Sequence, residues 1–138
     1  MSDKDYLKLA IEEGKKGRKP HLYGAVVVRD GEILATEHSH TWERRDPSAH
    51  AEVSAIAAAC QKIDRHNIPG ATLYASHEPC LMCFVCAAWA EIDRIVFVEP
   101  ASLSGSTYEF DGVNIFDMAK KLTRPMEVEK VTLKEEEE

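Results

Sequence analysis

Hydrophobic positions follow two different periods along this chain. In some segments apolar residues recur every three or four positions, as on one face of a helix, and in others they run on or alternate, as in a strand. Turn and capping residues separate these segments. The predicted helices span residues 2–16, 46–66, 81–91 and 115–122, and the predicted strands span residues 23–29, 32–38, 71–75, 94–98 and 127–133.

The connections between these elements predict how they assemble. Asp30-Gly31 is typical of a tight hairpin turn, so the first two strands should be antiparallel neighbours. The later strands alternate with helices, which favours right-handed crossovers and a parallel portion of the sheet. We therefore predict an α/β fold, a three-layer α/β/α sandwich over a five-stranded mixed sheet. A polar loop is expected at 41–45 and an irregular stretch at 99–112.

Length and composition indicate one domain. The chain has 138 residues, of which 44% are hydrophobic and 30% charged, an ordinary balance for a protein with a buried core. We assign residues 1–133 to this domain and residues 134–138 to an acidic tail. The sequence shows neither an N-terminal apolar run nor a stretch of about 20 apolar residues, so we expect a cytoplasmic protein that does not cross a membrane. Its four cysteines then indicate metal ligands and buried thiols rather than disulfides.

The formal charge of −7 bears on the kind of substrate. The glutamates at 135–138 contribute to it, and the rest of the chain is still acidic. Nucleic acids are bound largely through lysine and arginine, so this balance makes a nucleic-acid partner a poor expectation. Short basic stretches at 15–19 and 43–45 are the local exceptions, and the first is typical of a solvated helix end.

Two short motifs carry the chemistry. His50-Ala51-Glu52 and Pro79-Cys80-Leu81-Met82-Cys83 together supply one imidazole and two thiolates, one ligand fewer than tetrahedral zinc takes in a closed structural site. The open position can hold water, whose pKa zinc lowers to roughly 7. Glu52 is close enough along the chain to move protons around that water, so the pattern indicates a hydrolase. A structural zinc site remains the alternative.

These motifs belong to a wider resemblance that covers roughly residues 20–100. The chain resembles the zinc-dependent cytidine and deoxycytidylate deaminase superfamily, in its branch of guanine deaminases and tRNA adenosine deaminases. The resemblance implies a cytidine deaminase-like fold, a zinc cofactor held by His50, Cys80 and Cys83, and Glu52 as the proton shuttle. It also implies that subunits associate, as a homodimer or a higher homo-oligomer. The four segments that carry the resemblance are Tyr23–Val28, Asp46–Glu52, Glu78–Cys83 and Arg94–Phe97.

Two features of the metal site stay open in the sequence. His50 and Glu52 would point roughly 200° apart on a helix, so they can share a site only if zinc lies near the helix N-terminus. Which ring nitrogen of His50 binds is not fixed by the sequence. Cys86 is one further turn along from Cys83, and as a fourth ligand it would close the site, although we expect it to pack as a small apolar side chain.

Substrate contacts are predicted less directly than metal ligands. Tyr23 could stack on a heterocycle, Glu78 could contact substrate or orient the main chain, and Ala49 directly precedes the zinc histidine. Eleven residues before that histidine the family commonly has an asparagine that bonds the base, and here Ser39 takes its place with a shorter side chain. The acidic residue that guanine deaminases use after their fourth strand is also missing at Ser104. Its possible replacements are Glu99, Glu109 and Asp111.

Three functions follow in order of preference. The first is a zinc-dependent hydrolytic deaminase of a small nucleobase or nucleoside, guanine- or cytosine-like, which releases ammonia in purine or pyrimidine metabolism. The second is a tRNA-specific adenosine deaminase, disfavoured by the acidic C-terminus. The third is a non-catalytic scaffold stabilised by zinc, which would have no need of Glu52. The base itself and the roles of His38 and His40, which border the presumed pocket, are left undetermined.

Overall fold

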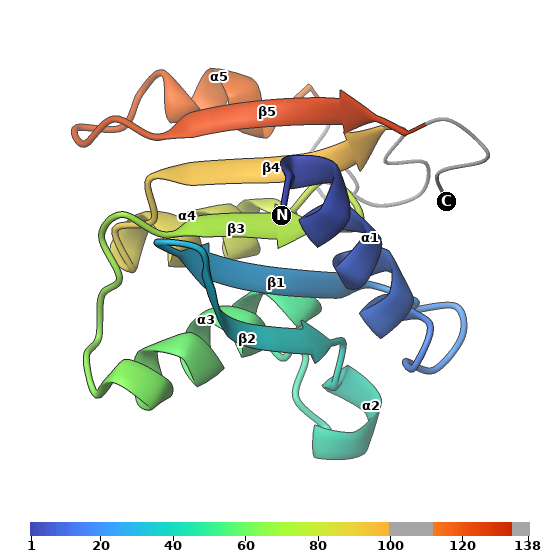
Figure 1. The fold of residues 1–138 in the computed structure, drawn as a ribbon. Coiled ribbons are helices and arrows are strands. Elements are labelled where there is room, and N and C mark those ends of the chain that lie inside the picture. The colour runs from blue at the N-terminus through green and yellow to red at the C-terminus, as the bar shows by residue number, and fades with distance from the viewer. Residues whose placement is uncertain (100–111, 134–138) are drawn as a thin grey trace.

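A computed structural model of the chain describes residues 1–99 and 112–133. Within these ranges five strands form one sheet in the order β2-β1-β3-β4-β5 (Figure 1). The strands are β1 (Gly24–Arg29), β2 (Glu32–His38), β3 (Thr72–Ala75), β4 (Arg94–Glu99) and β5 (Glu127–Thr132). The helices are α1 (Asp3–Gly14), α2 (Thr41–Arg44), α3 (Ala51–Ile63), α4 (Leu81–Trp89) and α5 (Ile115–Ala119).

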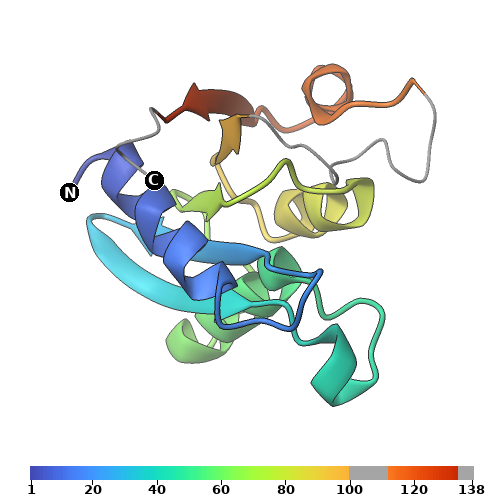
Figure 2. The same ribbon diagram turned by 90° about the vertical axis from the view of Figure 1, so that its right-hand side faces the viewer.

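The sheet is mixed, as the sequence predicts. Strand β1 pairs antiparallel with β2 and with β3, whereas β3, β4 and β5 run parallel to one another. Helix α1 covers one face, and α3, α4 and α5 cover the other, so the molecule has the three layers expected (Figures 1 and 2). The larger core cluster lies under α3, α4 and α5, and a second cluster lies under α1.

Local signals explain where the first elements begin and turn. Ser2 caps α1 in a capping box, because its hydroxyl accepts from the Asp5 amide while the Asp5 carboxylate accepts from the Ser2 amide. The hairpin turn forms at Asp30 and Gly31, both with positive φ (53° and 76°), which suits the twist of the paired strands. The hairpin confirms the sequence-based expectation.

Gly24 sets how closely α1 approaches the sheet. A Cβ atom at this position would lie 1.8 Å from the carbonyl oxygen of Ala10 and 2.6 Å from the amide nitrogen of Gly14. Both are backbone atoms of α1, so no side-chain rotation relieves the overlap. Glycine at the start of β1 therefore permits the helix to pack directly on the strand.

Three local predictions are wrong in detail. The polar segment at 41–45 forms the short helix α2, closed by Arg45 in the left-handed conformation. The helix expected from residue 46 begins at Ala51, because the side chain of Asp46 accepts hydrogen bonds from Ser48 and folds residues 46–48 into a turn instead. The apolar spacing in α3 also predicts Ala57 on the buried face beside Ile56. Ile56 is buried, but Ala57 is exposed, and Ala51, Ala55 and Ala59 are buried in addition.

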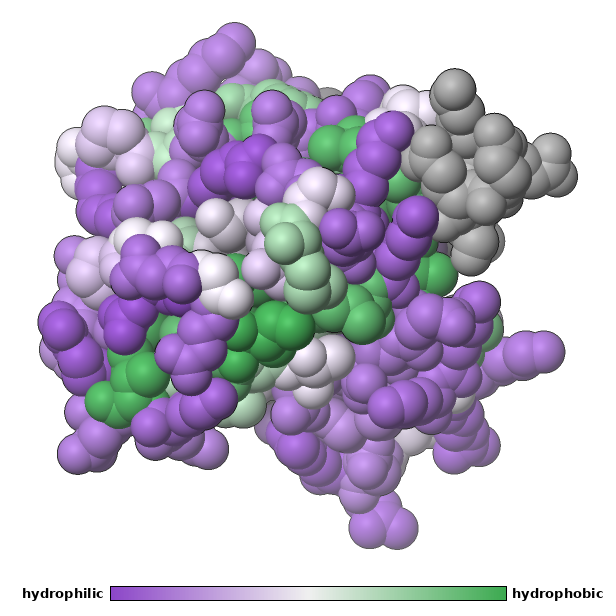
Figure 3. Space-filling view, in the orientation of Figure 1, coloured by the Kyte–Doolittle hydropathy of each residue, from purple (hydrophilic) through white to green (hydrophobic). Residues whose placement is uncertain are grey.

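The surface is largely polar. Figure 3 shows hydrophilic residues over most of one face, with apolar residues gathered in a band beside α1 over β1 and β2. No helix among residues 1–99 and 112–133 is long and apolar enough to cross a membrane. Ser104, Glu109, Asp111 and the acidic tail at 134–138 lie outside the described residues.

Candidate active site

Three side chains meet at one end of the sheet. The Nδ1 atom of His50 lies 3.6 Å from the sulfur of Cys80 and 3.6 Å from that of Cys83, and the two sulfurs are 3.6 Å apart. Tetrahedral zinc with bonds of about 2.0 Å to nitrogen and 2.3 Å to sulfur places such ligand atoms about 3.5–3.8 Å apart. The triangle therefore has the size of a three-ligand zinc site, with Nδ1 as the nitrogen that faces it.

Helix starts bring these ligands together. His50 is the N-cap of α3 and Cys80 the N-cap of α4, both with extended backbone, and Cys83 lies within the first turn of α4. The two helices contact each other on the same face of the sheet. Because His50 precedes the helix instead of belonging to it, the angle of roughly 200° between residues two apart on a helix does not separate His50 from Glu52.

The electrostatics of the two cysteines favour a cation between them. The hydrogen bond between the two sulfurs, together with one to His50, lowers the pKa of Cys80 to about 4. The same contact raises the pKa of Cys83 well above the ordinary thiol value, and burial adds to the effect. One proton is thus shared between two sulfurs. A metal ion in its place would ionise both, since thiolates and not thiols are metal ligands.

Glu52 lies beside this triangle with only 7% of its surface exposed. Burial raises the pKa of Glu52 to about 7, and the negative charge of Cys80 acts in the same direction, whereas His50 and a hydrogen bond from Cys83 oppose it. A buried carboxyl that can be charged or neutral near neutral pH is suited to proton transfer. An exposed structural glutamate is excluded by this burial.

Cys86 takes no part in the triangle. In the described part of the chain the group of ligand atoms at this place comprises His50, Cys80 and Cys83 alone. Cys86 packs on the larger core cluster, and burial raises the pKa of its thiol. A position for a fourth, exchangeable ligand therefore remains.

The residues expected to contact substrate lie around the neighbouring loops. The ring of Tyr23 meets the edge of His77 at 4.9 Å, and the Tyr23 carbonyl accepts from the amide of Ser39. Ser39 is buried, and its hydroxyl is 3.4 Å from that of Thr41. Ala49 is buried and accepts from the amide of His40. Glu78 is part-buried and lies two residues before Cys80.

Trp42 is a further candidate contact residue, which the motifs do not indicate. This side chain is 48% exposed, its indole nitrogen donates to Nδ1 of His21 at 2.7 Å, and the Arg18 guanidinium lies 4.3 Å from the ring centroid. It borders a hollow of about 280 Å³ that Ser39 also lines. A tryptophan within a predicted polar loop was the available signal, since an aromatic ring at such a place often contacts a ligand.

Comparison with known proteins gives a family match. Residues 1–99 match the model of the cytidine and deoxycytidylate deaminase zinc-binding region. Among curated relatives, a tRNA-specific adenosine deaminase of Aquifex aeolicus is 37% identical over 101 residues, covering 70% of this chain and 66% of that protein. The guanine deaminase of Bacillus subtilis is 32% identical over 130 residues, covering 92% of this chain and 81% of the relative.

Solved structures of both kinds share the fold. A tRNA:A34 deaminase superposes with a TM-score of 0.76 at 32% identity, over 91% of each chain. The Bacillus subtilis guanine deaminase superposes with a TM-score of 0.68 at 29% identity, over 99% of this chain and 89% of the other. The chain spans just under two thirds of the Aquifex aeolicus relative, at 66% of its length.

Proposed function

Because this chain belongs to the cytidine and deoxycytidylate deaminase family, we propose that it is a zinc-dependent hydrolytic deaminase of a small nucleobase or nucleoside. Its substrate would carry an amino group on a ring carbon next to a ring nitrogen, as guanine and cytosine do. Water replaces that amino group, leaving a carbonyl on the ring and releasing ammonia.

The triangle of His50, Cys80 and Cys83 with Glu52 buried beside it carries this proposal. The three side chains hold zinc, which when bound lowers the pKa of a water molecule to about 7 and so supplies the nucleophile. The N-terminus of α4, which presents Cys80 and Cys83, favours negative charge at this place.

Glu52 moves the protons of the reaction. Its carboxylate accepts a proton from the attacking water, and the carboxyl then returns that proton to the ring nitrogen beside the attacked carbon. A second transfer to the amino nitrogen makes ammonia the leaving group. The same residue can serve as base and as acid because its burial keeps both protonation states accessible.

Charge and alignment support a small substrate. The formal charge is −7, which opposes binding of a polyanion. The guanine deaminase relative also aligns over more of this chain than the tRNA-specific one, 92% against 70%. Ser39 in place of the family's asparagine implies that the preferred ring is held differently from guanine, with Tyr23, Ala49 and Glu78 as further contacts.

A tRNA-specific adenosine deaminase is the second candidate. The higher sequence identity, 37% against 32%, favours it, as does the higher TM-score of 0.76 against 0.68. Arg18 stacked on the exposed Trp42 is the kind of contact that single-stranded RNA can use.

A side-by-side assay separates the two candidates. Purified protein is given a panel of free bases, nucleosides and a tRNA with an adenosine at the wobble position, and ammonia or inosine is measured at low and high salt. We expect ammonia from at least one small substrate and little reaction with tRNA. Salt-sensitive reaction with tRNA, and none with any small substrate, would overturn this assignment in favour of the second candidate.

We also propose that the protein works in the cytoplasm as a homodimer or higher homo-oligomer. Four cysteines, two of them grouped with His50 as possible metal ligands, are the usage typical of a reducing compartment. The exposed end of α4 is the face that supports association, because Trp89 there is 79% exposed.

A further inference from the structure

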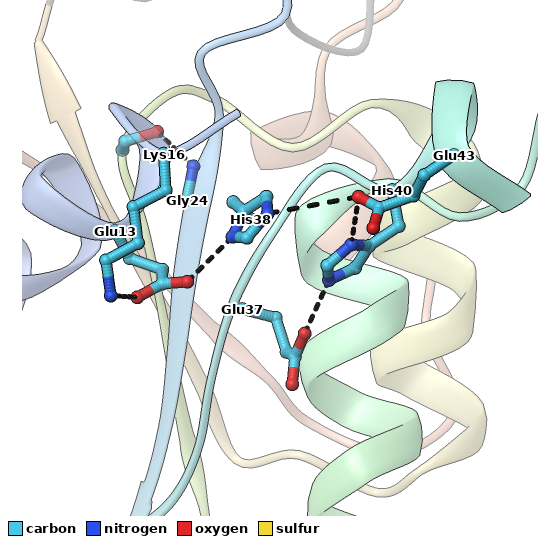
Figure 4. Close-up of polar contacts among 8 residues, drawn as sticks. Glu13, Lys16, Gly24, Glu37, His38, His40 and Glu43 are labelled. Atoms are coloured by element: carbon cyan, nitrogen blue, oxygen red, sulfur yellow. Dashed lines mark hydrogen bonds and ion pairs between the residues drawn. The ribbon is translucent and has the colours of Figure 1, made fainter. Parts of the chain in front are cut away.

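Two histidines and three glutamates form a second polar cluster, separate from the cysteine site (Figure 4). His38 ends β2, and His40 follows two residues later as the residue before α2. Their ring centroids are 4.4 Å apart. Glu43 lies one turn of α2 beyond His40, which returns its carboxylate to the rings.

Each imidazole has a carboxylate on one of its nitrogens. Nδ1 of His38 lies 2.7 Å from Oε2 of Glu13, and Nε2 of His40 lies 2.6 Å from Oε1 of Glu37. A ring N–H donated to a carboxylate fixes the tautomer and leaves the opposite nitrogen available. Histidines that bind metals in proteins are commonly oriented in this way.

The two opposite nitrogens converge on one oxygen. Oε1 of Glu43 lies 2.6 Å from Nδ1 of His40 and 4.0 Å from Nε2 of His38. Metal–nitrogen and metal–oxygen bonds of about 2.0–2.2 Å in a tetrahedral site place such atoms about 3.4 Å apart. The two observed distances bracket this value. A shift of less than 1 Å by the Glu43 side chain, which is 60% exposed, would equalise them.

We propose that His38 Nε2, His40 Nδ1 and Glu43 bind a divalent cation of the zinc class. Two imidazoles and one carboxylate are a ligand set that zinc and cobalt accept, without the thiolates of the first site. In the metal-free state both nitrogens of His40 contact carboxylates, so its ring carries two protons. The cation takes the place of the proton between His40 and Glu43, and that proton leaves to solvent.

Such a cation would join α1, β2 and α2 next to the active site. Glu13 comes from α1, His38 from β2 and Glu43 from α2. The amide of His40 also donates to the carbonyl of Ala49 at 2.9 Å, and Ala49 directly precedes the zinc ligand His50. Binding would therefore stabilise the loop that presents His50. The site does not depend on which substrate the enzyme uses.

Cobalt(II) is a suitable probe because its spectrum distinguishes the two sites. Cobalt bound by Cys80 and Cys83 shows a sulfur-to-metal charge-transfer band, whereas cobalt bound by imidazole and carboxylate shows only visible d–d bands. Purified protein of known zinc content is titrated with cobalt(II), in the wild type and in the variants Glu43→Gln and His38→Gln. We expect one equivalent of cobalt with d–d bands alone in the wild type, and affinity at least about tenfold weaker in both variants.

Two further variants serve as a second test of the cobalt site and as its control. Glu13→Gln removes the carboxylate behind His38 and should weaken cobalt binding by about 10–100-fold. Glu12→Gln is the matched control, since Glu12 lies on the same helix with its side chain 63% exposed and paired to Lys15. The proposal would be overturned if cobalt bound equally well to all variants. It would also be overturned if all of the bound cobalt showed the charge-transfer band. The cluster would then be a hydrogen-bonded network. Circular dichroism checks that each variant folds.

Discussion

At the scale of single residues, Glu52 differs from the other acidic side chains by its position. It lies within the first turn of α3, where a carboxylate is normally solvated, yet it is 7% exposed and faces the cysteine site. Burying an ionisable group costs free energy that a structural role would not require. The proton transfers of the proposed deamination would account for its place.

Replacing Glu52 by glutamine tests this role. The amide preserves the shape of the side chain but cannot accept a proton, so turnover should fall by roughly 10²–10⁴-fold or more. Bound zinc and the circular dichroism spectrum should stay unchanged, because Glu52 is not one of the three ligand residues. Metal analysis together with ammonia release on the best small substrate makes the measurement, with Glu12→Gln as the control. Near wild-type turnover would show that another group carries the protons.

At the scale of elements, an ion pair ties α1 to the middle of the sheet. Arg94 at the start of β4 donates to both carboxylate oxygens of Asp3, at 3.0 and 2.5 Å. The Tyr74 hydroxyl donates to the same carboxylate at 2.6 Å. The Arg94 hydrogen bond lowers the pKa of Asp3, with the Tyr74 contact adding to it against the opposing effect of burial. The charged form of Asp3 is thus favoured by folding.

This ion pair predicts a pH-dependent effect of Asp3→Asn on stability. Because the pKa of Asp3 is lower in the folded state than its unfolded value of about 3.9, the contribution is complete above that value and is lost as pH falls through the folded pKa. At about pH 7 the variant should lose roughly 1 kcal/mol of unfolding free energy, and the difference from wild type should shrink toward about pH 3.

Urea unfolding across this pH range measures the difference directly. Asp64→Asn is the control, since Asp64 is exposed and its left-handed conformation also suits asparagine. The control should show no comparable loss at neutral pH. A loss in Asp3→Asn that stays constant with pH would mean that the carboxylate charge is not what stabilises the contact between α1 and β4.

At the scale of the whole molecule, one large apolar side chain is exposed where it adds little buried apolar area to a monomer. Trp89 at the end of α4 is 79% exposed and borders a hollow of about 260 Å³ lined also by Val85, Leu122 and Met126. The sequence offers Phe84, Val85 and Ala88 as an apolar face of this helix for association, but Phe84 is buried in the chain's own core. Association of two copies at this end would remove Trp89 from water.

Trp89→Ala should therefore shift the protein toward monomer. Tryptophan is a frequent anchor of interfaces. Its truncation commonly costs about 2 kcal/mol or more of binding free energy, which raises the dissociation constant roughly 30-fold. Light scattering over a range of concentrations measures the change. Trp42→Ala is the matched control, since Trp42 is the other exposed tryptophan, at 48%. A monomeric wild type, or an oligomer equally stable in both variants, would contradict the prediction.

The sequence by itself determined the features that depend on near neighbours in the chain. The strand at 32–38 and the hairpin at Asp30-Gly31 follow from local residue preferences and from side-chain periods. The spacing of Cys80 and Cys83 by one helical turn likewise allows both sulfurs to face one point. The family resemblance and the mixed five-stranded sheet also came from the sequence.

Tertiary structure alone decided how distant segments meet. His50 and Cys80 are 30 residues apart, and the packing of α3 against α4 brings their atoms to 3.6 Å and selects Nδ1. The second cluster joins Glu13 to His38 across 25 residues, so the local sequence does not show which carboxylate orients this ring. Burial of Glu52 is likewise a property of the assembled layers. Periodicity and turn chemistry act over a few residues along the chain. The approach of two distant side chains depends instead on how whole helices and strands pack, and many different local sequences are compatible with the same packing.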